Sequence, residues 1–452
     1  MKVLFVSLGC DKNRVDSEKM LGILLKDGYT LTDDEQEADV IVVNTCCFIG
    51  DAVEESIDTL IEMGRMKTEG RCRALIACGC LAERYQDDFF AELPEVDAIV
   101  GTASWDRISE ALKRVLADKG EADADPAAAD AEHLRFCGDI DRLPAGTHPR
   151  VLTTGGHYAY LKIAEGCGKR CTYCAIPSVR GDYRSVPMED LLAEASRLAA
   201  DGVKELILVA QETTLYGTDL YGRKALPELL EKLSAIEDIR WIRLLYCYPE
   251  EIDDGLIAAI RGNEKVCNYL DIPIQHINDG ILRRMGRRTT GDGIRSLIAK
   301  LRAEIPGIAL RTTLITGFPG ETEEDFGELC DFVREIRFDR LGVFAYSQEE
   351  GTAAAVMPDQ IDEEVRGARR DRLMEIQQEI SLGRGQEFVG QTLEVFVEGE
   401  MSEEGTAVGR SYRDAPDVDG YVFFENAGTE SGRFERVLVT AASEYDLLGV
   451  ML

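Results

Sequence analysis

The chain has 452 residues, which is too long for a single hydrophobic core, so we expect two or three domains. Apolar residues make up 45% and charged residues 30%, a composition that excludes an intrinsically disordered chain. Lys and Arg number 51 against 84 Asp and Glu, giving a net charge of −33. Because binders of polyphosphates normally carry an excess of basic residues, this balance favours basic partners, or none.

The thirteen cysteines form an odd number, so they cannot all be paired in disulfides. A chain of this length does not need disulfides to hold a core, and we therefore expect free thiols or metal ligands in a reducing, cytoplasmic compartment. No window approaches the roughly 18 consecutive apolar residues of a membrane span, so no membrane association is expected.

The first region, about residues 1–120, alternates short apolar runs with amphipathic stretches. The apolar runs are Val3–Val6, Val40–Val43 and Ala74–Ala77. Continuous apolar runs of this kind are typical of parallel strands buried on both faces, and strands alternating with helices predict an open α/β sheet domain. Residues 121–149 lose this periodicity and include an Ala/Asp-rich stretch, which is typical of a linker.

The second region, about residues 150–382, repeats a strand–helix unit six times. The predicted strands are Tyr158–Ile163, Glu205–Val209, Ile242–Leu245, Tyr269–Ile272, Leu310–Ile315 and Leu341–Phe344. A complete TIM barrel has eight such units, so we predict a partial, open (βα)6 barrel.

The third region, about residues 385–452, consists of short β segments interrupted by Gly, Asn and Asp, which predicts a small antiparallel β-barrel. From residue 386 to the last residue it contains fourteen acidic residues, four arginines and no lysine.

The strongest chemical signal is three cysteines in a C-x3-C-x2-C pattern directly after the first predicted barrel strand. They are Cys167, Cys171 and Cys174. Thiolates at such tight spacing hold iron–sulfur clusters or zinc. Structural zinc needs four ligands, and the nearest further candidates, His157 and Cys247, lie well away in sequence. Three thiolates would leave one iron of a [4Fe-4S] cluster free for a small molecule, so the pattern favours the cluster over zinc.

This motif, with Tyr173 before its last cysteine, resembles that of the radical S-adenosylmethionine (SAM) enzymes. The resemblance implies that the free iron binds the methionine moiety of SAM. It also implies that one electron from the reduced cluster cleaves the sulfonium to give methionine and a 5′-deoxyadenosyl radical.

A second set of cysteines, Cys10, Cys46 and Cys80, follows the three apolar runs of the first region, one after each. Since the carboxyl ends of parallel strands meet at one edge of a sheet, these thiols could converge on one point. Three separate core cysteines are the alternative interpretation. Cys47 and Cys78 compete for two of the places, and spacing alone does not choose between them.

Three scattered cysteines before a radical SAM core and a small β-barrel after it resemble the layout of the methylthiotransferases, whose terminal barrel is called TRAM. The similarity extends almost from end to end and includes SLGCDKNRVDSE, NTCCFIGDAVEESID, GCLAERY, GKRCTYCAIPSVRGDYRS, TLITGFPGETEEDF and RLGVFAYSQEEGT. The resemblance assigns Cys10, Cys46 and Cys80 to an auxiliary cluster, giving two [4Fe-4S] clusters in total. Cys47 departs from the family, which usually has serine there.

Within that family the chain most resembles the branch that modifies the twelfth protein of the small ribosomal subunit. The implied reaction replaces a hydrogen on the β-carbon of an aspartate with a methylthio group. One SAM would supply the methyl group and a second the radical, with a low-potential electron donor such as flavodoxin. Two alternatives stay open: methylthiolation of a tRNA adenosine, which the acidic third region disfavours, and a non-catalytic adaptor that carries a metal cluster.

The SAM pocket is expected at the carboxyl ends of the barrel strands, where catalytic residues of βα barrels lie. The candidates are Gln211 and Glu212 after the second strand, His276 after the fourth, and Gly317 and Gly320 after the fifth. For the two glycines, the resemblance implies a backbone that lines the pocket, and an ordinary turn is the alternative. A lone histidine is more often structural than catalytic.

Overall fold

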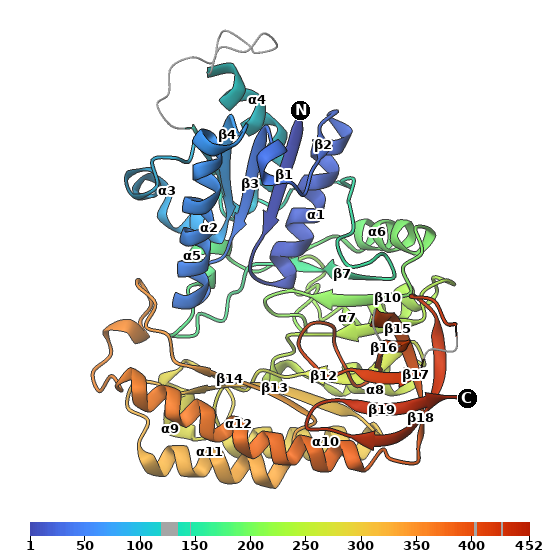
Figure 1. Cartoon of the computed structure of the whole chain (residues 1–452). Helices are drawn as coiled ribbons and strands as arrows, with labels where there is room; N and C mark the ends of the chain where they lie inside the picture. Colours follow the sequence, from blue (N-terminus) through green and yellow to red (C-terminus); the bar gives the residue numbers. More distant parts are fainter. Residues whose placement is uncertain (119–133, 145, 402–404, 426–427) are drawn as a thin grey trace.

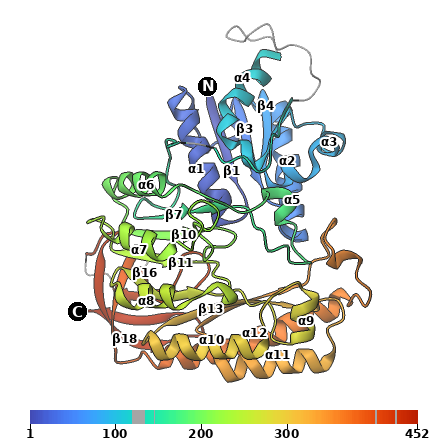
Figure 2. The same cartoon turned by 180° about the vertical axis from the view of Figure 1, so that it is seen from behind.

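The computed structural model describes residues 1–118, 134–144, 146–401, 405–425 and 428–452. It contains two six-stranded sheets with helices around them and one closed five-stranded barrel. Figures 1 and 2 show the first sheet (blue) above the second (green to orange), with the barrel (red) beside the second sheet. Among the described residues, no helix is both long and apolar enough to cross a membrane.

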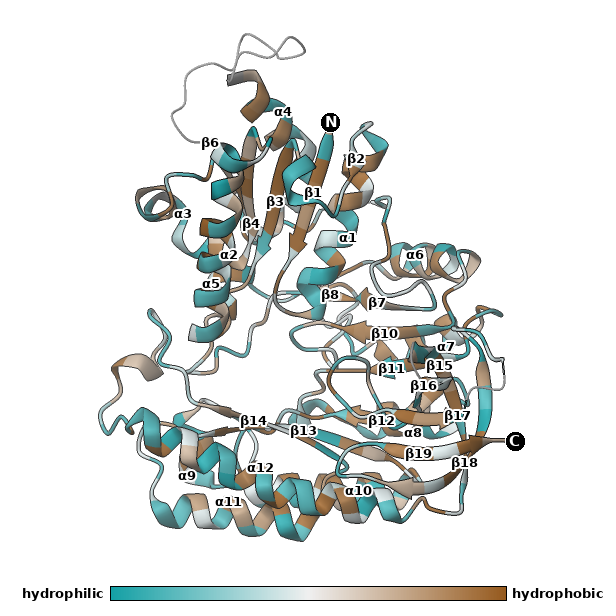
Figure 3. Cartoon of the chain, in the orientation of Figure 1, coloured by the Kyte–Doolittle hydropathy of each residue, from teal (hydrophilic) through white to brown (hydrophobic). Residues whose placement is uncertain are grey.

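The first sheet is entirely parallel, with strand order β2-β1-β3-β4-β5-β6, which confirms an open α/β sheet. Its strands are β1 (Lys2–Ser7), β2 (Thr30–Leu31), β3 (Val40–Thr45), β4 (Ala74–Gly79), β5 (Ala98–Val100) and β6 (Leu134–Phe136). Every residue of β3 and β4 is buried, as expected for central strands covered on both faces. Figure 3 shows these strands in the hydrophobic colours and the surrounding helices with two-toned faces.

Helices cover both faces of this sheet. Those present are α1 (Asp11–Lys26), α2 (Gly50–Glu69), α3 (Cys80–Glu92) and α4 (Ile108–Asp118). One core layer contains apolar side chains of α1 and α4, and the opposite layer contains those of α2 and α3.

One part of the predicted linker is a strand. β6 lies within residues 121–149 and pairs in parallel with β5 at the edge of the first sheet. Three residues are too few to show a periodicity, and the pairing with β5 determines their conformation. Residues 119–133, with the Ala/Asp-rich stretch, lie outside the described residues.

The second sheet confirms the partial barrel, because its six strands are all parallel in the order β14-β13-β12-β11-β10-β7. They are β7 (Tyr158–Lys162), β10 (Glu205–Val209), β11 (Trp241–Leu244), β12 (Val266–Asp271), β13 (Ala309–Thr316) and β14 (Arg340–Ala345). The outer face packs against α6 (Met188–Ala200), α7 (Leu226–Ser234), α8 (Asp254–Gly262), α9 (Asp279–Arg284), α10 (Gly291–Glu304), α11 (Glu323–Ile336) and α12 (Glu363–Gln386).

The smaller elements lie between these units. They are the paired strands β8 (Ala164–Glu165) and β9 (Arg184–Ser185), the short helix α5 (Ile176–Arg180), and the 3-10 turns η1 (Glu35–Glu37), η2 (Thr102–Arg107), η4 (Pro249–Glu251) and η5 (Ala354–Val356).

The third unit is a closed barrel with strand order β15-β16-β17-β19-β18. Its strands are β15 (Thr392–Met401), β16 (Thr406–Ser411), β17 (Val422–Glu425), β18 (Phe434–Ala442) and β19 (Leu447–Met451). The predicted barrel is therefore confirmed. One neighbouring pair, β17 and β19, is parallel, while the others are antiparallel.

The third unit is joined to the second sheet by a buried ion network. Glu205 accepts from Arg243 Nε at 2.8 Å and from Arg410 Nη2 at 2.7 Å, and all three side chains have no solvent exposure. Burial acts to raise the pKa of Glu205, but the charges of Arg410 and Arg243 outweigh burial and hold that pKa below its ordinary value. The network can exist only while the two units stay together.

We predict that Glu205→Gln destabilises the protein by about 3–5 kcal/mol, because it leaves two buried guanidinium groups without their carboxylate. The pKa of Glu205 is lower in the folded than in the unfolded protein. The contribution of Glu205 to the free energy of unfolding is therefore fully present above about pH 4.3, the ordinary pKa of a glutamate, and is lost as the pH falls through the folded-state pKa. Urea unfolding at neutral and acidic pH measures both effects.

The matched control is Glu394→Gln. Glu394 pairs with Arg240 at 2.9 Å between the same two units, but both side chains are about half exposed. This variant should lose less than about 1 kcal/mol. Equal losses in the two variants would contradict a special role for the buried network.

Candidate functional site

The C-x3-C-x2-C cysteines lie on the loop between β8 and α5, at the end of the first barrel strand. Cys167 and Cys171 are buried and Cys174 is half-buried. Burial raises the pKa of Cys167 to about 11 and that of Cys174 to about 12, and the charge of Cys171 adds to both rises. The three thiols thus lie within electrostatic range of one another. Metal binding there would have to displace their protons.

The second set comes from three separate loops of the first sheet. Cys10 precedes α1, Cys46 follows β3, and Cys80 begins α3 directly after β4. Burial raises the pKa of Cys46 to about 12, and the charges of Cys80 and Cys10 raise it further. The structure therefore brings these three thiols to the same edge of the sheet.

Gly9 shows how closely the first two of these loops approach. It has φ of +83°, and a Cβ atom there would lie only 2.8 Å from Cys46 Cβ and 2.9 Å from Cys46 Sγ. Only glycine leaves room for Cys46 at this point, and glycine also adopts the left-handed conformation without strain.

The two competing cysteines, Cys47 and Cys78, differ from each other in their surroundings. Cys78 is fully buried within β4, where its Sγ lies 3.5 Å from the carbonyl oxygen of Val43. Cys47 lies in the same apolar core as Cys80, between the sheet, α2 and α3, and the charges of Cys80 and Cys46 reach it. Within the described ranges, no three His, Cys, Asp or Glu side chains are arranged to hold a single metal ion. A four-iron cluster does not require that arrangement, because each thiolate binds a different iron.

Near the first cysteine set, several buried polar atoms have no hydrogen-bond partner. They are Gln211 Oε1, Glu212 Oε2, Glu250 Oε2, and Nε and Nη1 of Arg287. Burial raises the pKa of Glu212 to about 7. Arg287 lies 4.2 Å over the ring of Tyr248, whose hydroxyl is 3.9 Å from Cys171 Sγ. A buried polar atom left unpaired is costly, so such atoms mark a place for a ligand.

The remaining predicted SAM-pocket residues contact other parts of the protein, although His276 Nε2 is also a buried atom without a hydrogen-bond partner. His276 is fully buried, with Nε2 3.4 Å from Glu321 and Nδ1 accepting from Asn278 N–H at 3.0 Å. Gly317 N–H donates to both Glu321 oxygens at 3.0 Å, and Gly320 N–H donates to the carbonyl of Asp359.

Arginine side chains occupy the space beside both glycines. A Cβ atom on Gly317 would meet Arg366, and one on Gly320 would meet Arg284. Both glycines also have positive φ, +70° and +83°. The residue type at each position is therefore explained by arginine packing and backbone conformation.

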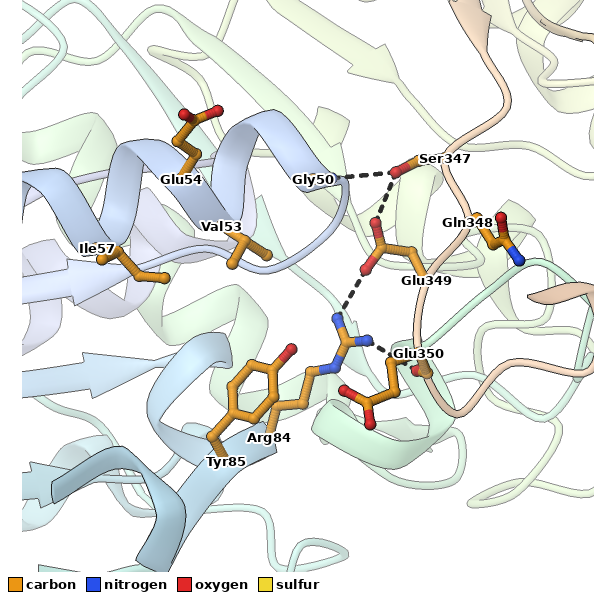
Figure 4. Close-up of a pocket in the computed structure, with 10 residues that line it drawn as sticks. All are labelled: Gly50, Val53, Glu54, Ile57, Arg84, Tyr85, Ser347, Gln348, Glu349 and Glu350. Carbon is orange, nitrogen blue, oxygen red and sulfur yellow. Dashed lines mark hydrogen bonds and ion pairs between the residues drawn. The ribbon is translucent and has the colours of Figure 1, made fainter. Parts of the chain in front are cut away.

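A contact that the sequence did not reveal joins α2 and α3 of the first unit to the segment that follows β14 in the second (Figure 4). Arg84 Nη1 binds Glu349 at 2.8 Å and the carbonyl of Cys47 at 3.3 Å, and Ser347 Oγ accepts from Gly50 N–H at 3.1 Å. Four of them, Gly50, Arg84, Ser347 and Glu349, line a cavity of about 400 Å³. Arg84 and Glu349 lie in two stretches noted for family similarity, GCLAERY and RLGVFAYSQEEGT, but nothing in those stretches indicates that they meet.

Comparison with protein families divides the chain into three matches. Residues 2–101 match the Uncharacterized protein family UPF0004, residues 161–333 the Radical SAM superfamily, and residues 389–452 the TRAM domain. Ribosomal protein uS12 methylthiotransferase RimO from Lachnoclostridium phytofermentans is 57% identical, covering 99% of each chain. Its counterpart from Pelotomaculum thermopropionicum is 52% identical, also covering 99% of each. The chain belongs to the RimO family of radical SAM methylthiotransferases. The resemblance found in the sequence is thereby confirmed.

Solved structures agree at the level of the fold. The radical S-adenosylmethionine methyltransferase TsrM from Kitasatospora setae, solved with cobalamin and a [4Fe-4S] cluster, has a TM-score of 0.56 at 14% identity. The match covers 95% of this chain and 83% of TsrM. A sheet domain followed by a radical SAM barrel is thus an arrangement found in experimental structures.

Proposed function

We propose that this radical SAM methylthiotransferase acts on ribosomal protein uS12, replacing a hydrogen on the β-carbon of an aspartate with a methylthio group. The substrate assignment rests on one observation: the chain is 57% identical, over 99% of both chains, to a relative named as a ribosomal protein uS12 methylthiotransferase. A ribosomal substrate would place the reaction in the cytoplasm.

We assign a [4Fe-4S] cluster to each set of three cysteines, Cys167, Cys171 and Cys174 in one and Cys10, Cys46 and Cys80 in the other. When bound, the first cluster supplies the electron that cleaves SAM, and the second holds the sulfur to be transferred. The electron donor in this proposal is a low-potential protein such as flavodoxin.

The open polar atoms near the first set fit the methionine end of SAM. That end carries one ammonium and one carboxylate, and the site offers an open Glu212 oxygen and an open Arg287 guanidinium. We assign Glu212 to the ammonium and Arg287 to the carboxylate, because opposite charges in a buried site form strong hydrogen bonds. Gln211 would line the same pocket. Gly317, Gly320 and His276 would act through the protein contacts described above, by holding the loops around the pocket in place.

The third unit supports a protein substrate over tRNA. Of its four arginines, Arg410 is paired with Glu205 and Glu398, and Arg413 with Asp339; both are buried. Arg433 and Arg436 are the two left on the surface, and this unit has no lysine. RNA binding requires cations that meet phosphates, whereas an acidic surface attracts a basic ribosomal protein.

A direct test offers the reconstituted enzyme uS12, the small ribosomal subunit and tRNA, all from cells that lack the gene. With SAM and a reductant, mass spectrometry should find a methylthio group on an aspartate of uS12 and none on tRNA. Modification of a tRNA adenosine alone would favour the tRNA branch. Absence of SAM cleavage by the reduced protein would leave the adaptor alternative.

The cluster assignment predicts about eight irons per chain after anaerobic reconstitution. Replacing Cys167, Cys171 and Cys174 with Ala should halve the iron and abolish 5′-deoxyadenosine formation. Replacing Cys10, Cys46 and Cys80 should also halve the iron but leave SAM cleavage detectable while methylthiolation stops. A Cys78→Ala variant, which changes a fully buried thiol in β4, is the control and should keep all the iron. Four irons in the unmodified protein would contradict the two-cluster assignment.

The pocket assignment predicts that Glu212→Gln weakens SAM binding about tenfold or more, since hydrogen bonds to charged groups contribute about 1.5–3 kcal/mol. Equilibrium dialysis with labelled SAM measures this effect. Glu251→Gln is the control, because Lys169 and Lys224 already engage that carboxylate at 2.5 and 3.0 Å. Unchanged affinity in Glu212→Gln would remove Glu212 from the pocket.

A further inference from the structure

Arg180 belongs to the loop of one cysteine set in sequence but contacts the other set in space. It ends α5, six residues after Cys174, and its side chain is 2% exposed. The guanidinium extends into the first unit, where Nη1 binds Asp16 at 3.0 Å and Nη2 donates to Asn13 Oδ1. An arginine buried this deeply is held there by specific partners.

Asn13 connects that guanidinium to the auxiliary cysteines. Its Oδ1 is also 3.7 Å from Cys80 Sγ, and its Nδ2 donates to the carbonyls of Leu8 at 3.1 Å and Thr45 at 3.0 Å. Leu8 and Thr45 belong to the loops that carry Cys10 and Cys46. The side chain of Asn13 therefore contacts all three cysteine-bearing segments, and Arg180 holds it from the opposite side.

The charge of Arg180 also acts on these thiols directly. Burial acts to lower the pKa of Arg180, but negative charge on Cys80, Glu165, Asp16 and Cys10 outweighs burial and raises that pKa well above its ordinary value.

Lys162 is the second cation of the same network and provides a comparison. Its Nζ binds Asp16 and, at 2.6 Å, Glu165, and its side chain is 5% exposed. Two carboxylates thus balance two cations. Among the described residues, the hydrogen bonds of the Lys162 ammonium go to Asp16 and Glu165, whereas the Arg180 guanidinium also reaches Asn13, so only Arg180 is linked through that side chain to the cysteine-bearing loops.

We propose that Arg180 is a positioning residue for the auxiliary site: it fixes Asn13 among the three cysteine-bearing loops and supplies the positive charge that raises the reduction potential of the cluster bound there. The proposal rests on the proposed function in that Cys10, Cys46 and Cys80 hold a cluster. Reduction adds a negative charge to a cluster, and a nearby buried cation stabilises the reduced form. Net charge and hydrogen bonding near the sulfurs are among the determinants of cluster potential.

The test measures the auxiliary cluster alone, in full-length protein whose Cys167, Cys171 and Cys174 are replaced by Ala. Potentiometric titration followed by electron paramagnetic resonance gives its reduction potential. In this background we expect Arg180→Met to shift the potential to more negative values and Arg180→Lys to restore most of the shift. Lys162→Met removes an equal charge from the same network and should shift the potential less.

The outcomes separate this proposal from the function on which it depends. A background protein without iron would refute the auxiliary cluster itself. A cluster whose potential is the same in Arg180→Met as in the background, or shifts no more than in Lys162→Met, would refute the role of Arg180 only. If Arg180→Met does not fold, Glu165→Gln combined with Arg180→Met keeps the network neutral, and its potential is compared with that of Glu165→Gln alone. An equal potential in those two proteins would likewise refute the role of Arg180.

Discussion

A charge that is removed from water needs a partner of opposite sign, and this constraint determines how the units are joined. Helix α1 shows it most clearly. Its buried residues include Asn13, Asp16 and Glu18, and the last of these accepts from Arg150 Nε at 2.7 Å and Thr153 N–H at 2.8 Å. Neither the helix nor the barrel could bury these groups alone. Charge pairing therefore determines how the first and second units pack together. The loops that carry the cysteines lie beside this interface, so the same ion pairs determine their relative positions.

The same constraint reduces the positive charge on the surface. Arg243, Arg410 and Arg413 are buried against carboxylates where the third unit packs on the second, and Arg340 binds Asp414 in the same region. Arginines committed in this way cannot meet phosphates. In the described part of the third unit, two of the four arginines, Arg410 and Arg413, are buried, whereas Asp414 is the one buried acidic residue, joined by the side chain of Asp419. Acidic residues therefore outnumber basic ones on the surface of this unit by a larger factor than the residue counts alone suggest. Such a surface favours fast encounter with a basic protein, because long-range attraction acts before contact.

The sequence predicted the elements that have a strong local signal. All six strands of the second sheet contain enough apolar or β-branched residues to be recognised in the sequence, and each predicted strand overlaps the observed one. The strands β2, β5 and β6 are only two or three residues long, and they are held by pairing with their neighbours in the sheet. Helix α1 begins at Asp11, four residues before its first apolar residue, Val15, and this polar first turn, in which Lys12 and Asn13 are buried, carries no apolar pattern that would mark the start of the helix.

The candidate site residues also divide into those with a local sequence signal and those defined by contacts with distant segments. The six cysteines are candidates because their spacing and the family similarity can be read in the chain, and Glu212 is a candidate because it follows a strand of the barrel. Arg84 and Arg180 carry no sequence signal of a site role, since an arginine in a short segment is ordinarily a surface residue. Arg287 stands out in the sequence only as one of a basic cluster, Arg283, Arg284, Arg287 and Arg288, which could hold the SAM carboxylate, pair internally or meet the substrate. Only burial and the identity of the partners distinguish Arg84, Arg180 and Arg287 from the other arginines, and both depend on chain segments far away in sequence.

One carboxylate lies between the two candidate sites. Glu165 immediately precedes the loop of the first cysteine set, accepts from Gln211 Nε2 at 3.0 Å and binds Arg180 at 3.0 Å. Arg180 and Lys162 outweigh the burial that would raise its pKa and hold that pKa far below its ordinary value. Glu165 therefore stays charged at any physiological pH. It places a constant negative charge next to Gln211 near the first cysteine set and next to Arg180 near the second. Because the network contains equal numbers of cations and carboxylates, a charge change at either site alters a balanced set of groups. The two sites consequently share one buried electrostatic environment although their cysteines come from different units.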